Sequence, residues 1–320
     1  MDKIKMLVRC MKRTASQFRR MYLVMNEKKN CQPHLLAMII KHIHSIEKGL
    51  AMKHIRPGFG LPRITKMLTY IEKYVQLTGD MKPIECSMAY SVIKKYVEYH
   101  ENIKFSNNEY ELVKQRAKYV FESYEKDLRD DMAGILHINT KEIEVDLQAF
   151  EHCVMTRHSI RDFSNQPVSE ELLKKAISLA MHAPSACNRQ STRVYILDHS
   201  KFDTIDGWTG GVKTFLDSVD KMLIITGQMS AYEKDEFWQY SVSASIFVGY
   251  LTLALHAVGL GGCLLQRPLL SDSHWRRVAQ THGIPDDEQV VCAMAIGVPE
   301  EEVKVPQSQR LEYNRIVKQL

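Results

Sequence analysis

Residues 33–127 carry apolar positions at the spacing of amphipathic helices. One such face begins after Pro33, ends before Gly49, and consists of Leu36, Ile39, Ile40, Ile43 and Ile46. Further stripes begin near Pro62 and Pro83, and Ser106 with Glu109 three residues later forms a capping-box pattern ahead of another. The pattern therefore predicts a helical first part, in which the apolar stripes form a core rather than a cofactor site.

One segment of this helical part interrupts the stripes. The run His44-Ser45-Ile46-Glu47-Lys48-Gly49-Leu50 is followed by Arg56-Pro57-Gly58-Phe59-Gly60, a turn-rich loop between helices. Loops with arginine and aromatic groups are common binding elements. The pattern favours a plain connector, with a binding loop as the alternative.

After Asp146 the pattern changes to a mixture of strands and helices. Ser169 is predicted to cap a helix that Pro184 ends, and β-branched runs at 194–197, 222–226 and 290–296 predict strands. The segment 237–258 between the last two runs is apolar on so many sides that it must be buried, as the spine of the domain or against a second subunit. We expect an all-α domain over residues 1–148 and an α+β domain over 149–320.

Composition is that of an ordinary globular protein. The chain has 320 residues, of which 45% are hydrophobic and 25% charged, and this excludes disordered and fibrous classes. Seven cysteines lie scattered without a Cys-x-x-Cys pair, which favours reduced thiols. No uninterrupted apolar run approaches the length of a membrane span and no signal peptide is recognisable. A cytoplasmic location is expected.

The net charge of +5 is concentrated at the N-terminus. The basic residues there are Lys3, Lys5, Arg9, Lys12, Arg13, Arg19, Arg20, Lys28 and Lys29, against Asp2 and Glu27. With apolar residues such as Leu7, Met11 and Phe18 between them, this segment could touch a peripheral partner or an anionic surface. The pattern favours a solvated helix that docks on its own protein. No specific nucleic-acid partner is indicated.

Two short segments of the second part carry the candidate chemistry. The first, Arg157-His158-Ser159-Ile160-Arg161, places two permanently charged, forked donors around a hydroxyl, as a phosphate and a polar ring edge require. The second, Ala183-Pro184-Ser185-Ala186-Cys187-Asn188-Arg189-Gln190, leaves a helix at its proline and carries an amide side chain that could face a ring. Together they indicate a flavin-binding site.

These segments resemble the FMN-dependent nitroreductase family. The resemblance adds a helix between them, a buried helix, Gly259-Leu260-Gly261-Gly262, a late strand and a basic C-terminal tail, and it covers about residues 150–320. It implies an α+β fold with a central mixed sheet wrapped by helices, preceded here by the all-α part. It also implies a homodimer with one FMN in each interface pocket.

The resemblance assigns the phosphate, ribityl and pyrimidine-edge contacts of FMN to Arg157, His158, Ser159 and Arg161. In the tail, Arg310 matches a family arginine that pairs with the phosphate. Many members carry a second basic residue two positions earlier, where this chain has a serine. Neutralisation of the phosphate would therefore depend more strongly on the remaining arginines.

The resemblance places the second segment and a glycine pair at the flavin ring. Pro184 and Ser185 belong to this cofactor site, and Asn188 would meet the isoalloxazine. Gly261 and Gly262 match a turn whose backbone lies close to the ring, because absent side chains allow approach. The usual Gln-Pro-Trp after the asparagine is Gln-Ser-Thr here, which removes a rigid aromatic neighbour.

Other kinds of site find little support in the sequence. The thirteen histidines include no His-Glu-x-x-His and no Cys/His cluster with ligand spacing, so no metal is expected. The glycine-rich run 207–211 is not bracketed by the strand and helix of a dinucleotide fingerprint. NAD(P)H is therefore expected to bind transiently over the flavin, as in the family.

The implied function is a two-electron, ping-pong transfer from NAD(P)H to a small nitro or quinone-like acceptor. No catalytic residue is assigned, because the flavin carries the chemistry. One alternative is a specialised flavin dehydrogenase or reductive enzyme whose biosynthetic substrate is recognised with the helical domain. Another is a non-enzymatic adaptor with a decayed flavin site.

Overall fold

A computed structural model describes residues 2–27, 30–205, 207–267 and 272–319. For some residues of two helices the structure describes the backbone but not the side chain. These residues are 2, 3, 9, 10, 12, 13, 17 and 272. The predicted basic cluster at the N-terminus is therefore described only in part, since Asp2, Lys3, Arg9, Lys12, Arg13, Lys28 and Lys29 fall outside it.

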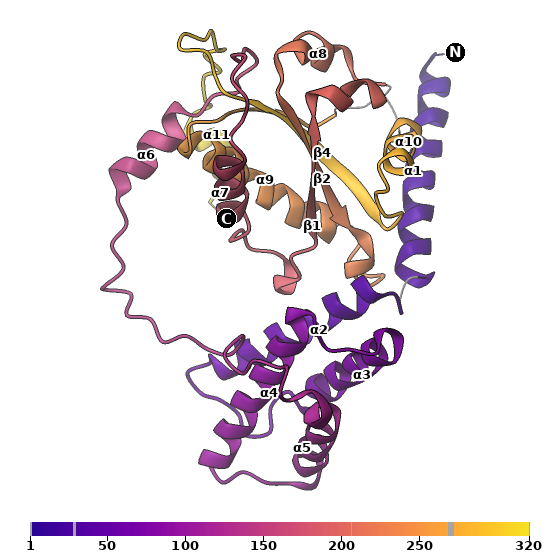
Figure 1. The fold of residues 1–320 in the computed structure, drawn as a ribbon, viewed down its shortest axis with the longest axis vertical. Coiled ribbons are helices and arrows are strands. Elements are labelled where there is room, and N and C mark those ends of the chain that lie inside the picture. The colour runs from indigo at the N-terminus through magenta and orange to yellow at the C-terminus, as the bar shows by residue number, and fades with distance from the viewer. Residues whose placement is uncertain (1, 28–29, 206, 268–271, 320) are drawn as a thin grey trace.

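The first part of the chain is helical, as the apolar spacing predicts. Its helices are α1 (Asp2–Glu27), α2 (Gln32–Leu50), α3 (Leu61–Thr78), α4 (Ile84–Asn102), α5 (Asn108–Phe121) and the 3-10 turn η1 (Glu122–Tyr124). Helices α2 to α5 form a bundle in the lower half of Figure 1, around a core that includes Ile39, Ile43, Ile64, Leu68 and Val92. A connection without helix or strand, 125–146, leads from this bundle to the rest of the chain.

The start of α5 corrects the predicted capping box. The side chain of Asn107, not Ser106, caps the helix, because its Oδ1 accepts a hydrogen bond from Tyr110 N at 2.7 Å. Ser106 donates instead to the Glu111 carboxylate at 2.8 Å. Serine and asparagine both cap helices well, and here the asparagine directly before the first helical residue is the cap.

The loop 56–60 packs as a connector onto the helical bundle. The Phe59 carbonyl accepts from the Tyr96 hydroxyl at 2.5 Å, and the Gly58 amide donates to His100 Nε2 at 3.0 Å. The Phe59 ring lies against the end of α2, where a Cβ on Gly49 would be 2.0 Å from a ring carbon. The glycine that ends the predicted stripe therefore makes room for this ring.

Gly49→Ala should destabilise the protein by about 1–3 kcal/mol, because the Phe59 ring is held by Tyr96 and His100 and cannot move aside freely. Gly211→Ala is the matched control, since a Cβ there meets nothing within 4 Å. Urea unfolding of both variants measures the effect. Equal stability of the two variants would show that the ring contact does not constrain this position.

The second part is an α+β unit. Its helices are α6 (Leu147–Thr156), α7 (Glu170–Ala180), α8 (Gly210–Lys213), α9 (Gln239–Ala257), α10 (Asp272–Thr281) and α11 (Tyr313–Ile316), with 3-10 turns η2 (Ala186–Asn188), η3 (His199–Thr204), η4 (Leu216–Ser218) and η5 (Met229–Ala231). Its strands are β1 (Thr192–Asp198), β2 (Lys221–Gln228), β3 (Gly261–Leu265) and β4 (Glu288–Gly297). The cap by Ser169 and three of these strands confirm the predictions.

The sheet has the order β1-β2-β4-β3, and helices cover it as predicted (Figure 1). The four strands pair antiparallel, and the parallel pairing found among the described residues is a single bridge between Ser159 and Gly262. Alternate residues of β2 face opposite sides: Met222 and Ile224 pack toward Trp275, and Leu223 and Ile225 toward α7 and α9.

Helix α9 is the apolar helix predicted over 237–258. Ala244, Phe247, Val248 and Leu251 are buried against the sheet, so the helix is a spine of this part. It is also long and apolar enough to pass the length and composition test for a membrane span, with 44% of the tested window buried. The face that packs on the sheet is buried, and the remaining face is taken up below.

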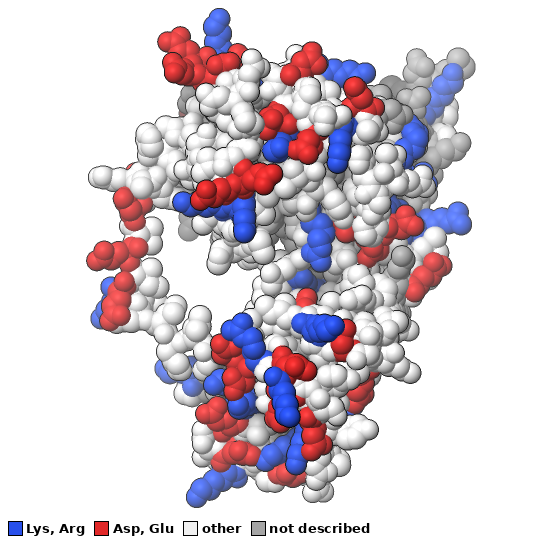
Figure 2. Space-filling view, in the orientation of Figure 1, with Lys and Arg blue, Asp and Glu red and all other residues white. Residues whose placement is uncertain are grey.

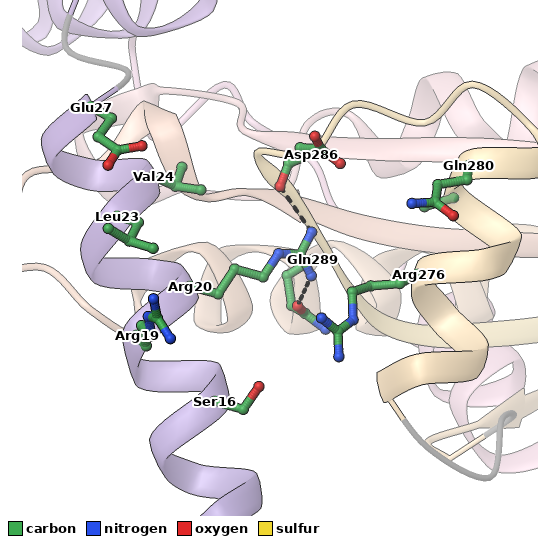
Figure 3. A pocket seen from close by; sticks show the side chains of 11 residues that line it. Ser16, Arg19, Arg20, Leu23, Val24, Glu27, Arg276, Gln280, Asp286 and Gln289 are labelled. Atoms are coloured by element: carbon green, nitrogen blue, oxygen red, sulfur yellow. Dashed lines mark hydrogen bonds between the residues drawn. The ribbon is translucent and has the colours of Figure 1, made fainter.

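Helix α1 docks on the second part of the chain, as the favoured interpretation predicts (Figure 1). Met21, Val24 and Met25 share a buried cluster with residues 229–240. Arg20 donates to Gln289 Oε1 at 2.7 Å and to the Asp286 carbonyl at 2.8 Å across a cavity of about 450 Å³ (Figure 3). Lys and Arg side chains remain visible along α1 at the edge of Figure 2.

Candidate functional site

The first predicted segment lies along the edge strand β3. Arg157 caps the C-terminus of α6 in an extended conformation, and the chain then runs beside the glycine pair, with Ile160 N donating to Gly262 O at 3.1 Å. Further on, Ser164 N donates to Val298 O at 2.8 Å. The segment is thus held as an added strand by backbone hydrogen bonds on both sides of Phe163.

Phe163 anchors this segment through two glycines. Gly261 and Gly297 are cross-strand partners in β3 and β4, and a Cβ on either would lie 3.0 Å or 2.7 Å from the Phe163 ring. Gly262 differs, because a Cβ there would meet its nearest atom at 3.4 Å, which is an ordinary contact. Packing therefore gives Gly261 a structural role, whereas Gly262 has none that the structure shows.

Four of the predicted residues line one cavity. It has a volume of about 320 Å³ and is lined by Arg157, His158, Gly261 and Gly262, together with residues from the end of α9. Among the described residues neither Arg157 nor Arg161 forms an ion pair. Glu151 and Asp162, the nearby carboxylates in the sequence, therefore do not pair with these arginines. A half-buried arginine without a carboxylate partner is suited to an anion supplied from outside.

His256 belongs to this cavity, although sequence reasoning missed it. It lies in the last turn of α9, and its Nε2 is 2.8 Å from the Thr156 hydroxyl. Burial, and then the charge of Arg157, lower the pKa of His256. The ring is therefore a neutral hydrogen-bonding group at pH 7, and its position in the last turn of an apolar helix was the available signal.

The second predicted segment has an unusual backbone. Cys187, Asn188 and Gln190 have positive φ angles of 53°, 54° and 49°, a region that non-glycine residues rarely occupy. The Ser185 hydroxyl accepts a hydrogen bond from Gln190 N at 3.1 Å, and the Ser185 carbonyl accepts one from Asn188 N at 2.9 Å. Such strain persists where surrounding contacts enforce it and gathers at functional sites.

Arg189 supplies the enforcing contacts. Its side chain is fully buried, forms an ion pair with Glu236, donates to Ala231 O at 2.9 Å, and lies over the Tyr232 ring at 4.5 Å. Burial alone would raise the pKa of Glu236, but the hydrogen bond and charge of Arg189 outweigh it and lower that pKa. Sequence reasoning missed this pair, because 47 residues separate its members.

The predicted site residues do not all meet in one chain. Ser185 lines a different cavity of about 440 Å³, together with Ile40, Ile84 and Met88 of the helical part. The linings of these two cavities share no residue and do not include Ser159, Arg161, Pro184, Asn188 and Arg310. Arg310 lies exposed in the tail, where its Nη1 donates to Ser308 O at 2.5 Å.

A model of the nitroreductase family matches residues 154–206 and 208–298. A protein of Archaeoglobus fulgidus, named for an inferred NADH dehydrogenase/NAD(P)H nitroreductase activity, is 26% identical over 151 residues, which are 47% of this chain and 84% of that protein. The matched ranges begin within α6 and end after β4.

Solved structures of the same kind are similar to the second part. A nitroreductase, so named by inference, from Desulfovibrio desulfuricans in complex with FMN has a TM-score of 0.47 at 18% identity, over 55% of this chain and 98% of that one. An FMN-dependent nitroreductase from Clostridium difficile has a TM-score of 0.45 at 24% identity, over 52% and 98%. By the family model, the C-terminal half of this chain belongs to the nitroreductase family.

Proposed function

We propose that the protein is an FMN-dependent oxidoreductase that transfers two electrons from NAD(P)H to a small nitro or quinone-like acceptor in a ping-pong cycle. One observation carries the proposal: Arg157 and His158 line a cavity with Gly261 and Gly262, and the arginine has no carboxylate partner among the described residues. The family match and the named relative support the same reaction type.

The residues of this cavity fit the phosphate and the polar edge of FMN. Arg157 offers a forked, permanently charged donor, and His158 and the backbone beside Gly262 offer further polar contacts. When bound, FMN supplies the two-electron chemistry with nicotinamide and acceptor. The chain supplies placement and positive charge. Because His256 beside it is neutral, Arg157 carries the positive charge that would pair with a phosphate.

We propose that a second copy of the chain completes the site. Trp238, the residue before α9, continues the stripe that Val242, Ile246 and Tyr250 form on the unburied face of the helix. Each is four residues from the next and 38% to 61% exposed. Residues at this spacing form one stripe, and exposed apolar patches mark interfaces. Leu311, Tyr313 and Ile316 of the tail are exposed as well. Pairing of these surfaces would bring the separated halves of the predicted site together across the dimer.

Ile246→Asp should convert the dimer to a monomer and lower FMN occupancy, because a buried, unpaired carboxylate in an apolar interface is costly. Leu112→Asp on α5, at a position 67% exposed and outside this stripe, should leave both properties unchanged. Light scattering coupled to gel filtration measures the mass. A wild-type monomer that retains FMN would contradict the shared site.

Steady-state kinetics test the reaction. NADH or NADPH should be oxidised with menadione or a nitroarene as acceptor, and double-reciprocal plots at several acceptor concentrations should give parallel lines, because donor and acceptor use the same slot in turn. Intersecting lines would require both substrates to bind together and would contradict the ping-pong cycle.

The second cavity favours one alternative, a specialised flavin enzyme. Ser185 and the helical part line it jointly, through Ile40, Ile84 and Met88, so a substrate there would be recognised by both parts of the chain. This alternative includes the proposal that the chain consists of two domains, residues 1–148 and 149–320. Bound FMN in a protein that consumes neither NADH nor NADPH would support this alternative.

We also propose a cytoplasmic location, on the basis of the reduced cysteines and the family's chemistry.

A further inference from the structure

A separate cationic cavity lies where the helical part meets the C-terminal half. It has a volume of about 230 Å³ and is lined by residues of α2, α3 and the segment that follows η5. Its charged lining and histidine are Lys41, His42, Arg63, Lys66, Lys73 and Glu233. It shares no lining residue with the three cavities described above.

Three of its cations come from one face of α3. Arg63, Lys66 and Lys73 follow the helical repeat, so their side chains leave the helix on the same side. None of the three forms an ion pair with a described residue. Like charges on one helix face repel each other, and an anion bound between them would relieve this repulsion.

The carboxylates near the cavity do not balance these charges. Glu233 is the one carboxylate in its lining and binds Lys41. Glu236, 3.7 Å from Lys41, is engaged by the buried Arg189. Four cations therefore face one carboxylate that is already paired.

His42 is a buried polar group whose hydrogen-bonding capacity is unused. His42 is only 4% exposed, and its ring stacks on the Tyr70 ring with 5.8 Å between the ring centroids. The ring has no hydrogen bond to a described residue, and its Nδ1 is shielded from solvent. Burial, and then Arg63, Lys41 and Lys66, lower the pKa of His42 to about 4. The ring is neutral at pH 7 and has one N–H to donate.

We propose that this cavity binds a phosphate group, as free phosphate or as the monoester of a small molecule, through Arg63, Lys66 and His42. Arginine and lysine around a neutral imidazole donor form a set that matches phosphate oxygens. The volume is below the range of about 300–1,000 Å³ usual for drug-sized ligands, so a small anion or the phosphate end of a ligand fits. This proposal does not depend on the proposed FMN site.

Calorimetric titration of the full-length protein, loaded with FMN and then freed of unbound FMN, with inorganic phosphate and with phenyl phosphate tests the proposal. Each probe should bind with one site per chain. Tighter binding of phenyl phosphate identifies a monoester as the ligand, and equal or weaker binding identifies free phosphate. The double variant Arg63→Gln/Lys66→Gln should bind at least about tenfold more weakly, because it loses two charge-assisted contacts.

Lys94→Gln/Lys114→Gln is the matched control, since it removes the same charge from exposed, ion-paired positions of α4 and α5. This control, and Arg157→Ala at the separate FMN cavity, should bind both probes as the wild type does. Circular dichroism checks the fold, and Arg63→Gln alone, which should also weaken binding of both probes, replaces the double variant should that one unfold. The absence of saturable binding by either probe, or equal loss in the Lys94/Lys114 control, would overturn the proposal.

Discussion

Replacing Arg157 by alanine should weaken FMN binding by about 10- to 100-fold. The guanidinium lines the cavity beside Gly261 and Gly262 and has no ion-pair partner among the described residues, so the phosphate would be its main electrostatic contact. Loss of a charged hydrogen bond of this kind costs about 1.5–3 kcal/mol. Quenching of FMN fluorescence during titration measures the dissociation constant.

Arg129→Ala is the matched control for this variant, because Arg129 is exposed, is paired with Asp131, and does not line the cavity of Arg157. It should bind FMN as the wild type does. Arg161→Ala should have a smaller effect than Arg157→Ala, since Arg161 is exposed and does not line the cavity. Unchanged affinity in the Arg157 variant would remove this residue from the FMN site.

Replacing Glu236 by glutamine should lower stability by about 3–5 kcal/mol, which corresponds to roughly 6–20 °C in melting temperature. The change leaves the fully buried Arg189 charge without its carboxylate, and Arg189 holds the strained segment that contains Asn188. Thermal unfolding followed by circular dichroism measures the loss. A reduced FMN affinity should accompany it, because the segment would relax.

The pH dependence of this loss provides an internal test. The folded-state pKa of Glu236 is lowered, so the stability that its carboxylate contributes is present above its ordinary pKa of 4.5 and disappears as the pH falls through the folded value. The gap between wild type and variant should therefore shrink as the pH falls below 4.5. Asp131→Asn, which breaks a fully exposed pair, should leave the stability nearly unchanged at any pH. A similarly small cost for the Glu236 variant would contradict the anchoring role.

Regular elements were predictable because local patterns encode them. The stripe that gives α2 and the β-branched runs of β1, β2 and β4 repeat at the period of one helix face or one sheet face. The strand β3 was missed, because Gly261-Gly262 signals a turn when read alone, and only the seating of Phe163 on Gly261 and Gly297 makes it a strand.

The arrangement of the candidate site could be predicted only in part. Arg157 and the glycine pair line one cavity, whereas Ser185 lines another cavity to which the helical part contributes. Contacts between distant segments decide such arrangements. The pairing of Arg189 with Glu236 and the cationic cavity around His42 arise in the same way, from side chains that no local spacing connects.

The visible absorption spectrum of the purified, full-length protein is the decisive measurement for a flavin-dependent function. We expect the absorption bands of oxidised FMN at one flavin per chain, bleached by NADH or NADPH and restored by a quinone. A colourless protein that takes up no added FMN would contradict it.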